Sequence, residues 1–299
     1  MSRRTPLARP PRLDLVDAVV LEVHGLVHDQ GWLADRALER ALRRERKLWA
    51  SERRLSAESV YGLIRMQGQL AFLLGGAEPG APFRGLSLSL LYAAWLVRFG
   101  GASADEAAAR LAVPPARLRG LKEAEARMAA IADPHLRLAV EGSLPRWIVE
   151  RFVTELGEEE ATRLVRVLND RAPLTVRANL LHCDREALRS RLASEGVEAV
   201  PTRFSPWGLT LDGHQNAFAL RSFQEGWFEI QDEGSQLIAL ACAARPGKVV
   251  VDACAGAGGK ALALSAEMHN RGTLWALDAD SERLSEARRR ARRAGVDNL

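Results

Sequence analysis

The chain has 299 residues, of which 47% are hydrophobic and 27% are charged. This is the composition of a globular protein with room for two or three domains, and it excludes a collagen, a largely disordered chain and a disulfide-stabilised miniprotein. The longest uncharged stretch worth testing, Gly85 to Val97, is far shorter than the roughly 20 residues that a membrane helix needs. We therefore expect no membrane partner.

The basic N-terminal segment MSRRTPLARPPRLDL has neither an apolar core nor a small-residue cleavage site, so it does not resemble a secretory signal. A cytoplasmic location is the resulting expectation. Cys183, Cys242 and Cys254 form no Cys-x-x-Cys pair, which indicates neither a disulfide framework nor a metal site.

Arginine dominates the basic residues: the net charge is only +4, but 38 of the 42 basic residues are arginine. Arginine suits phosphate recognition and stacking on bases, so RNA is a reasonable partner. Residues 35–54 carry eight Arg or Lys residues next to Trp32 and Trp49, which suits a surface for an RNA backbone. The alternative is a solvated helix face, because acidic residues are interleaved.

Helices are predicted from Leu13 to about Arg137, where apolar residues recur at three and four spacing. Ser103 and Glu106 form a capping box before one helix, and the segment ARLRGLKEAEARMAAIA is predicted as another. Two more helices follow Trp147. We expect a helical bundle over residues 1–142 and place the next domain at 143–230.

Strand signals begin at Pro173, where LTVRANLL is rich in β-forming residues. A helix opened by Asp184, two short strands (VEAVPTRF and GLTLDG) and a hairpin turning at Glu225-Gly226 complete the pattern. These segments predict a small α/β module that ends near Ile230.

A third pattern begins at Gln231, where helical and strand-like segments alternate as in a doubly wound parallel sheet. The chain stops at Leu299, where the next strand is expected. We therefore expect residues 231–299 to be the first part of a truncated domain, and residues 248–299 to be unstable alone. The predicted fold class is α plus α/β.

The most informative segment is VVVDACAGAGGK, residues 249–260, in which an apolar strand enters a loop of small residues and then a helix. Backbone N–H groups at such a helix N-terminus bind phosphates and nucleoside cofactors. The pattern lacks the first glycine and the Ser or Thr of a phosphate-binding P-loop, and it fits the dinucleotide motif only in its alanine variant. An NAD enzyme remains the weaker alternative.

An S-adenosylmethionine methyltransferase needs an acidic residue at the end of the first strand, a small-residue turn, and an acidic residue ending the second strand. Asp252, the loop 256–259 and Asp278 fill these places. A carboxylate accepts hydrogen bonds from both ribose hydroxyls, so Asp278 is the expected clamp. The alternative for residues 278–281 is a plain helix N-cap.

These residues resemble the RsmB/NOP/Sun group of RNA (cytosine-5) methyltransferases, whose loop usually reads DxCAAPGGKT. Two departures are Gly256-Ala257 in place of Ala-Pro, and Ala261 in place of Thr. The matching segments are Gln231-Asp232 with Ser235-Gln236, Asp252 to Lys260, Leu277-Asp278, Arg283-Leu284 and Arg293 to Gly295, with weaker matches at Leu144 to Trp147, Pro173 to Asn179 and Phe223 to Gln231.

The resemblance implies a NusB-like bundle, a small RNA-binding module at 143–230 and the start of a class I methyltransferase sheet. It implies S-adenosylmethionine as cofactor, RNA and in particular ribosomal RNA as substrate, and no metal; we also expect a monomer. Arg177 and Asn179 are implied to lie near the RNA backbone or at a domain interface. The cofactor-binding residues implied are Cys254, Ala255, Gly256, Ala257, Gly258, Gly259, Lys260 and Asp278.

The implied reaction adds a cysteine thiolate to carbon 6 of cytosine, which makes carbon 5 nucleophilic. In the family, the catalytic cysteines lie in Pro-Cys and Thr-Cys motifs downstream of the second helix of the sheet, and this chain contains neither motif. We expect the nucleophile beyond Leu299 and no methylation by the chain alone. The alternative is a catalytically incomplete RNA-binding protein.

Overall fold

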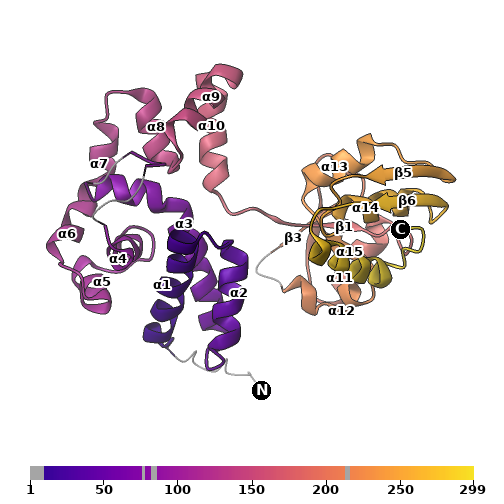
Figure 1. Ribbon diagram of the computed structural model, residues 1–299, viewed down its shortest axis with the longest axis horizontal. Helices are drawn as coiled ribbons and strands as arrows, with labels where there is room; N and C mark the ends of the chain where they lie inside the picture. The colour runs from indigo at the N-terminus through magenta and orange to yellow at the C-terminus, as the bar shows by residue number, and fades with distance from the viewer. Residues whose placement is uncertain (1–9, 76–77, 82–85, 213–215) are drawn as a thin grey trace. The chain divides into compact units, whose positions relative to one another are not determined.

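The computed structural model describes residues 10–75, 78–81, 86–212 and 216–299, and the chain divides into two compact units, Met1–Asp170 and Arg171–Leu299 (Figure 1). Most of the N-terminal segment, and Gly85 of the apolar stretch, lie outside the described residues. Within the described ranges, no helix combines the length and the hydropathy that a membrane span requires.

The first unit contains helices only among its described residues, so the predicted helical N-terminal region is confirmed. Ser103 accepts a hydrogen bond from the Glu106 N–H (3.1 Å), as a helix cap does. The helices are α1 (Leu13–Gln30), α2 (Ala34–Arg44), α3 (Ala50–Leu73), α4 (Leu88–Arg98), α5 (Ala104–Leu111), α6 (Ala116–Arg119), the 3₁₀ helix η1 (Gly120–Glu123), α7 (Ala124–Ala129), α8 (Pro134–Gly142), α9 (Arg146–Leu156) and α10 (Glu158–Asn169).

The core of the bundle forms where an apolar face of α1 packs against α3 and α4. Val16, Val20 and Val23 of this face are fully buried. A buried polar contact lies inside the same core, because the Tyr92 hydroxyl donates to Asp17 (2.8 Å). Arg110 neutralises the Asp17 carboxylate, because its Nη2 donates to the same oxygen (2.6 Å) and its Nε donates to the other oxygen (3.2 Å). The buried negative charge of Asp17 is therefore paired with a positive charge, as burial in a low-dielectric interior requires.

The segment predicted as one helix after Pro115 is instead divided into α6, η1 and α7. Gly120 stands at the break, and glycine weakens the interior of an α-helix. Leu118 and Leu121 are both buried, and the tighter 3₁₀ turn places residues three apart on one side. Burial of this pair accounts for the interruption.

Helices α9 and α10 pack on α8 around a separate core made by Leu138, Ala139, Val149 and Val165. The Gln69 side chain of α3 donates to the Val140 carbonyl (3.2 Å), which ties α8 to the bundle. The first compact unit consequently extends to Asp170, whereas the sequence placed a boundary after residue 142.

The second unit begins with a four-stranded antiparallel sheet in the order β2-β3-β1-β4. Strands and helices follow the chain order β-α-β-β-α-β, and the core comprises Val176, Leu188, Leu192, Leu209 and Phe228. The elements are β1 (Leu174–Ala178), α11 (Arg185–Ser194), β2 (Ala199–Pro201), β3 (Gly208–Leu211), the 3₁₀ helix η2 (Ala217–Ala219), α12 (Arg221–Gln224) and β4 (Phe228–Ile230).

The hairpin predicted to turn at Glu225-Gly226 is wrong. Gly226 instead ends the short helix α12, with φ +79° and with its N–H bonded to the Phe223 carbonyl. The next N–H, of Trp227, bonds to the Ser222 carbonyl, as at a left-handed helix C-terminus. A Glu-Gly pair is compatible both with a hairpin turn and with the end of a helix. Here β4 pairs with β1 and not with the residues before the turn.

The last part of the second unit alternates helices and strands as predicted. Strands β5 and β6 are parallel, with Val250 opposite Leu274, and the Leu274 N–H also bonds to the Asn298 carbonyl (2.9 Å). One sheet face packs on the helices, while the other leaves Val251 and Trp275 58% and 59% exposed. The elements are α13 (Glu233–Ala241), β5 (Lys248–Asp252), α14 (Gly259–Glu267), β6 (Gly272–Ala276) and α15 (Ser281–Ala294).

Candidate functional site

The loops that follow β5 and β6 lie side by side at the carboxyl ends of the two parallel strands. The Leu277 N–H donates to the Asp252 carbonyl (2.8 Å), and the Ala255 N–H donates to the Leu277 carbonyl (2.9 Å). This edge of an open parallel sheet is where α/β proteins bind ligands. The two segments singled out in the sequence, 252–260 and 278–280, therefore meet in space.

Asp278 holds the glycine loop with its carboxylate. One oxygen accepts from the Asp280 N–H (2.9 Å) and the other accepts from the Gly256 N–H (2.8 Å). These two hydrogen bonds lower the pKa of Asp278 below its ordinary value, so the group is ionised at neutral pH. A carboxylate has about four acceptor sites, which leaves capacity for ligand hydroxyls.

The helix-cap alternative applies to Asp280, not to Asp278. Asp280 is the N-cap of α15, and its carboxylate accepts from the N–H groups of Glu282 (2.9 Å) and Arg283 (3.3 Å). Asp278 is thus directed to the glycine loop while its neighbour caps the helix.

Gly258 is the N-cap of α14 and occupies the left-handed region with φ +83°. A Cβ at this position would lie 3.0 Å from the Ala287 Cβ of α15, so the loop also approaches that helix closely. The N-terminal N–H groups of α14 follow directly, and such groups favour anionic ligand groups. Ala261, which replaces the usual threonine, is fully buried.

Asp252 carries a carboxylate oxygen that needs a partner. Its Oδ1 accepts from the Cys254 N–H (3.3 Å), whereas Oδ2 is buried without a hydrogen bond to any described residue. Buried acceptors are normally satisfied, so a ligand donor is expected there. Together, Asp252, Asp278 and the small loop fit a nucleoside cofactor with a cationic amino group and ribose hydroxyls.

Arg177 and Asn179 are both buried, at 2% and 3% exposure, between the small sheet and the rest of the second unit. Burial lowers the pKa of Arg177 to about 10, and its Nε donates to Gln231 (2.7 Å). Asn179 donates to the carbonyls of Gly226 and Ala294, each at 2.8 Å. The geometry agrees with the domain-interface alternative, and direct RNA contact by these residues stays a prediction.

The contact between the two parts of the second unit is close. A Cβ added to Gly226 would lie 2.0 Å from the Arg293 carbonyl oxygen, so only glycine allows this approach. We refer to the contact of β1, β4 and Gly226 with α15 as the seam.

A charged cluster at the seam was missed in the sequence. Glu229 of β4 is buried and accepts hydrogen bonds from Arg290 and Arg293 of α15. Arg290 also donates to the Ala257 carbonyl of the glycine loop (2.9 Å). The two arginines are three residues apart in the run RRRARR, which is the spacing of one helix face and the only available sequence signal.

The three cysteines have different surroundings. Burial raises the pKa of Cys183 to about 11, which disfavours its thiolate. Cys242 is exposed at the C-cap of α13 and donates to the Ile238 carbonyl of that helix (3.3 Å), while Cys254 is exposed in the glycine loop. Across the described ranges, no three His, Cys, Asp or Glu residues are grouped for a metal ion.

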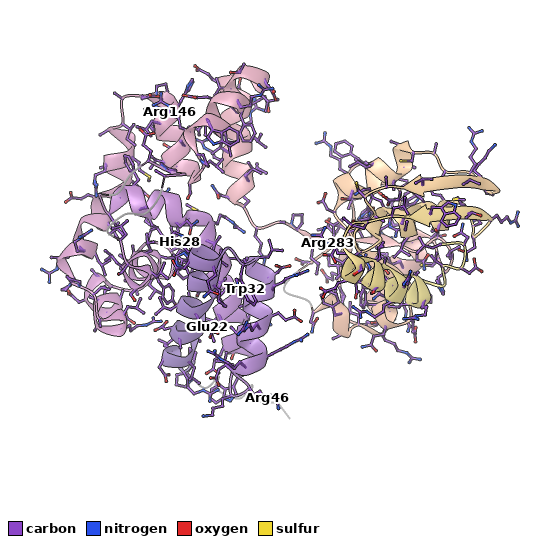
Figure 2. The ribbon with its side chains drawn as sticks, in the orientation of Figure 1. Glu22, His28, Trp32, Arg46, Arg146 and Arg283 are labelled. Carbon is purple, nitrogen blue, oxygen red and sulfur yellow. The ribbon has the colours of Figure 1, made fainter. Side chains whose placement is uncertain are left out.

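The arginine-rich segment 35–54 forms α2 and the start of α3, and Trp32 and Arg46 lie in this part of the bundle (Figure 2). Arg40 stacks over Trp32 (5.0 Å), while Arg43 and Arg44 form ion pairs with Glu39 and Glu22. The cations are exposed but partly paired, so the structure contains features of both alternatives, and RNA binding here stays a prediction.

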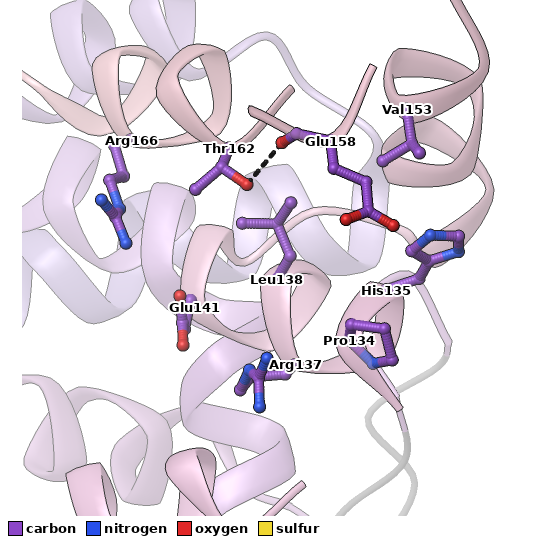
Figure 3. Close-up of a pocket in the computed structure, with 9 residues that line it drawn as sticks. All are labelled: Pro134, His135, Arg137, Leu138, Glu141, Val153, Glu158, Thr162 and Arg166. Atoms are coloured by element: carbon purple, nitrogen blue, oxygen red, sulfur yellow. Dashed lines mark hydrogen bonds between the residues drawn. The ribbon is translucent and has the colours of Figure 1, made fainter. Parts of the chain in front are cut away.

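A pocket in the first unit lies between α8 and α10 (Figure 3). It brings the basic side chains of His135, Arg137 and Arg166 together with Glu141 and Glu158. The charges are mixed, and no residue of the glycine loop lines it. We assign it no role in the candidate site.

Two family models match the second unit and the helices before it. The RsmF/B-like methyltransferase ferredoxin-like domain matches residues 144–217, and the ubiE/COQ5 methyltransferase family matches residues 228–299. The first includes three strands of the small sheet, and the second includes the glycine loop and Asp278. Both models describe methyltransferases.

Curated relatives align with most of the chain. A probable ribosomal RNA small subunit methyltransferase B of Bacillus subtilis is 30% identical over 82% of this chain and 58% of its own length. The protein of the same description from Synechocystis is 28% identical over 89% of this chain and 64% of its own length. The chain thus spans about three fifths of the length of these relatives.

Solved structures share the fold. The crystal structure of PH0851 superposes with a TM-score of 0.70 at 22% identity, covering 98% of this chain and 69% of that one. A methyltransferase homolog protein from Pyrococcus horikoshii gives a TM-score of 0.52 at 27% identity, over 56% of this chain and 55% of its own.

Proposed function

Because the chain belongs to the RsmB/NOP/Sun family of RNA methyltransferases, we propose that it binds S-adenosylmethionine at the glycine loop and serves methyl transfer to carbon 5 of a cytosine in RNA. The names of the curated relatives support ribosomal RNA of the small subunit as the substrate class. One observation carries the cofactor assignment: an ionised Asp278 fixes the glycine loop through Gly256.

Two carboxylates of the chain would bind different parts of the cofactor. Asp278 would accept the ribose hydroxyls with the acceptor sites that the loop leaves open. Asp252 would receive a donor at its unpartnered Oδ2, which suits the amino group of the methionine part. Residues 254–260 would line the site with small side chains and backbone N–H groups.

S-adenosylmethionine, when bound, supplies a methyl group on a sulfonium centre. Cytosine carbon 5 becomes nucleophilic when a thiolate adds at carbon 6, so the proposed reaction needs a cysteine thiolate. Cys183 is protonated and half-buried, and Cys242 lies outside the loop. Cys254 belongs to the cofactor loop itself, so we assign the attacking thiol to none of the three.

Cofactor binding is tested by calorimetry with S-adenosylhomocysteine, the demethylated product, on the full chain. Asp278→Asn removes the charge and one pair of acceptor sites, and a lost hydrogen bond to a charged group weakens binding by about 10- to 100-fold. Asp280→Asn is the matched control, because asparagine caps helices as well as aspartate does. That control should bind within about 2-fold of the original chain.

Binding of NADH but not of S-adenosylhomocysteine would contradict the proposed cofactor. Equal losses in the two variants would instead mean that the effect comes from the loss of one negative charge, which both variants share, and not from the contacts of Asp278. For the substrate, the expected result is tighter binding of the chain to small-subunit ribosomal RNA than to transfer RNA, measured by filter binding at one fixed salt concentration.

A further inference from the structure

The glycine loop is held from outside by a side chain that belongs to none of the motifs. We propose that Arg290 of α15 is a positioning residue for this loop, and that Glu229 of the small sheet sets the direction of its guanidinium. The inference deepens the proposed function and rests on it, since the loop's role is cofactor binding.

The geometry of the guanidinium makes the two contacts dependent on each other. Arg290 Nε and Nη2 both donate to Glu229 Oε2, at 3.0 and 2.9 Å, while Nη1 donates to the Ala257 carbonyl at 2.9 Å. The five N–H groups of arginine lie in one rigid plane. Fixing Nε and Nη2 on one carboxylate therefore fixes where Nη1 points.

Glu229 is a firm anchor because it is part of the sheet and nearly inaccessible. Its side chain is 3% exposed, and its residue lies opposite Arg177 in the pairing of β4 with β1. Arg293 gives the carboxylate a second cation. With little water to compete, such charge-assisted hydrogen bonds are stronger than those at a surface.

The loop needs this support at the place where it departs from the family pattern. Gly256-Ala257 replaces Ala-Pro, so the backbone has lost a proline ring that would fix φ and has gained a glycine. Asp278 binds the Gly256 N–H and Arg290 binds the Ala257 carbonyl, which restrains both ends of this dipeptide. Side-chain contacts thus replace the restraint that the chain itself lacks.

Hydrogen exchange by mass spectrometry of the full chain, without cofactor, tests the proposal. Arg290→Met keeps the aliphatic stem and removes the donors, and we expect residues 254–259 to exchange about 10-fold faster. Arg289→Met is the matched control: this neighbouring arginine is exposed and pairs with Glu286. Peptides from β1 and α14 should stay within about 2-fold of the control.

Two results would overturn the proposal. Unchanged exchange of residues 254–259 in Arg290→Met would show that the loop does not depend on Arg290. Equal acceleration in β1 and α14 would reduce Arg290 to a general stabilising residue. Should Arg290→Met fail to fold, Glu229→Gln keeps the shape of the anchor, and exchange about 3-fold faster and confined to the loop is expected, because the hydrogen bond to a neutral amide is weaker.

Affinity for S-adenosylhomocysteine is measured on the same proteins. About 10-fold weaker binding by Arg290→Met than by Arg289→Met is expected from the same lost hydrogen bond. If the original chain does not bind this molecule, the proposed cofactor function fails. The exchange ratio still decides whether Arg290 positions the loop, so the two failures are distinguishable.

Discussion

Replacing Asn179 with alanine separates a structural role from an RNA-binding one. Its amide donates to the carbonyls of Gly226 and Ala294 at 2.8 Å each, and its oxygen accepts from the Leu181 N–H at 3.2 Å. The side chain joins β1 to both sides of the seam. We expect Asn179→Ala to destabilise the second unit and to leave the RNA affinity of the folded protein unchanged.

The size of the effect follows from the burial of these contacts. The residue is 3% exposed, so water does not readily replace the lost donors. A typical hydrogen bond contributes about 1 kcal/mol to stability, and an unsatisfied buried polar group costs about 1–3 kcal/mol. For two carbonyls deprived of the same donor group, a loss of about 2–4 kcal/mol in the free energy of unfolding is expected.

Urea unfolding followed by hydrogen exchange of β1 and α15 peptides reports on the second unit alone. Asn169→Ala is the control, because that side chain donates to the Gly142 carbonyl within the first unit. It should leave β1 and α15 unaffected. RNA affinity is compared by filter binding at one fixed salt concentration. A stability loss below about 0.5 kcal/mol together with weaker RNA binding would refute the structural reasoning.

The remaining predictions concern acid stability and the open sheet face. Hydrogen bonds from Arg12 lower the pKa of Glu52 from 4.5 to about 2, so its contribution is complete above pH 4.5 and is lost as the pH falls toward 2. Glu52→Gln should flatten the pH dependence of the thermal unfolding of the helical first unit in that window, as circular dichroism would show. An unchanged profile would exclude the Arg12–Glu52 pair as the source of that dependence. Trp275→Thr removes a large exposed apolar side chain from β6, so it should reduce binding of an apolar fluorescent dye by about half. Leu274→Thr changes the buried face of the same strand and should instead increase binding of the dye.

Local sequence signals predicted the elements that bear the glycine loop. The apolar strand β5, the loop of small residues and the cap of α15 each depend on residues that are neighbours in the chain, so the sequence pattern was enough to predict them. Asp278 was predicted as the ribose clamp from the same local pattern, and its contact with a ligand stays a prediction. Only the structure shows that Asp278 contacts the glycine loop and that Asp280 caps α15, because both residues follow the same strand in the sequence.

The seam could not be predicted, because its contacts join residues far apart in the chain. Glu229 and Arg290 are 61 residues apart, and Asn179 and Ala294 are 115 apart. The Glu-Gly pair at 225–226 shows the same limit in miniature, since a hairpin and a helix end require the same glycine conformation. Only the pairing of β4 with β1 separates the two.

The seam also determines how the molecule comes apart. The Asn179 amide and the Glu229 carboxylate form buried hydrogen bonds between the small sheet and α15, and these would be lost if either part unfolded alone. Residues 171–299 should therefore unfold cooperatively, in a single calorimetric transition. We therefore expect no separate unfolding transition at the border between the sequence motifs near residue 230. A protease that recognises native-state openings should cut the chain near Asp170 long before it separates the sheet from the loop that the sheet supports.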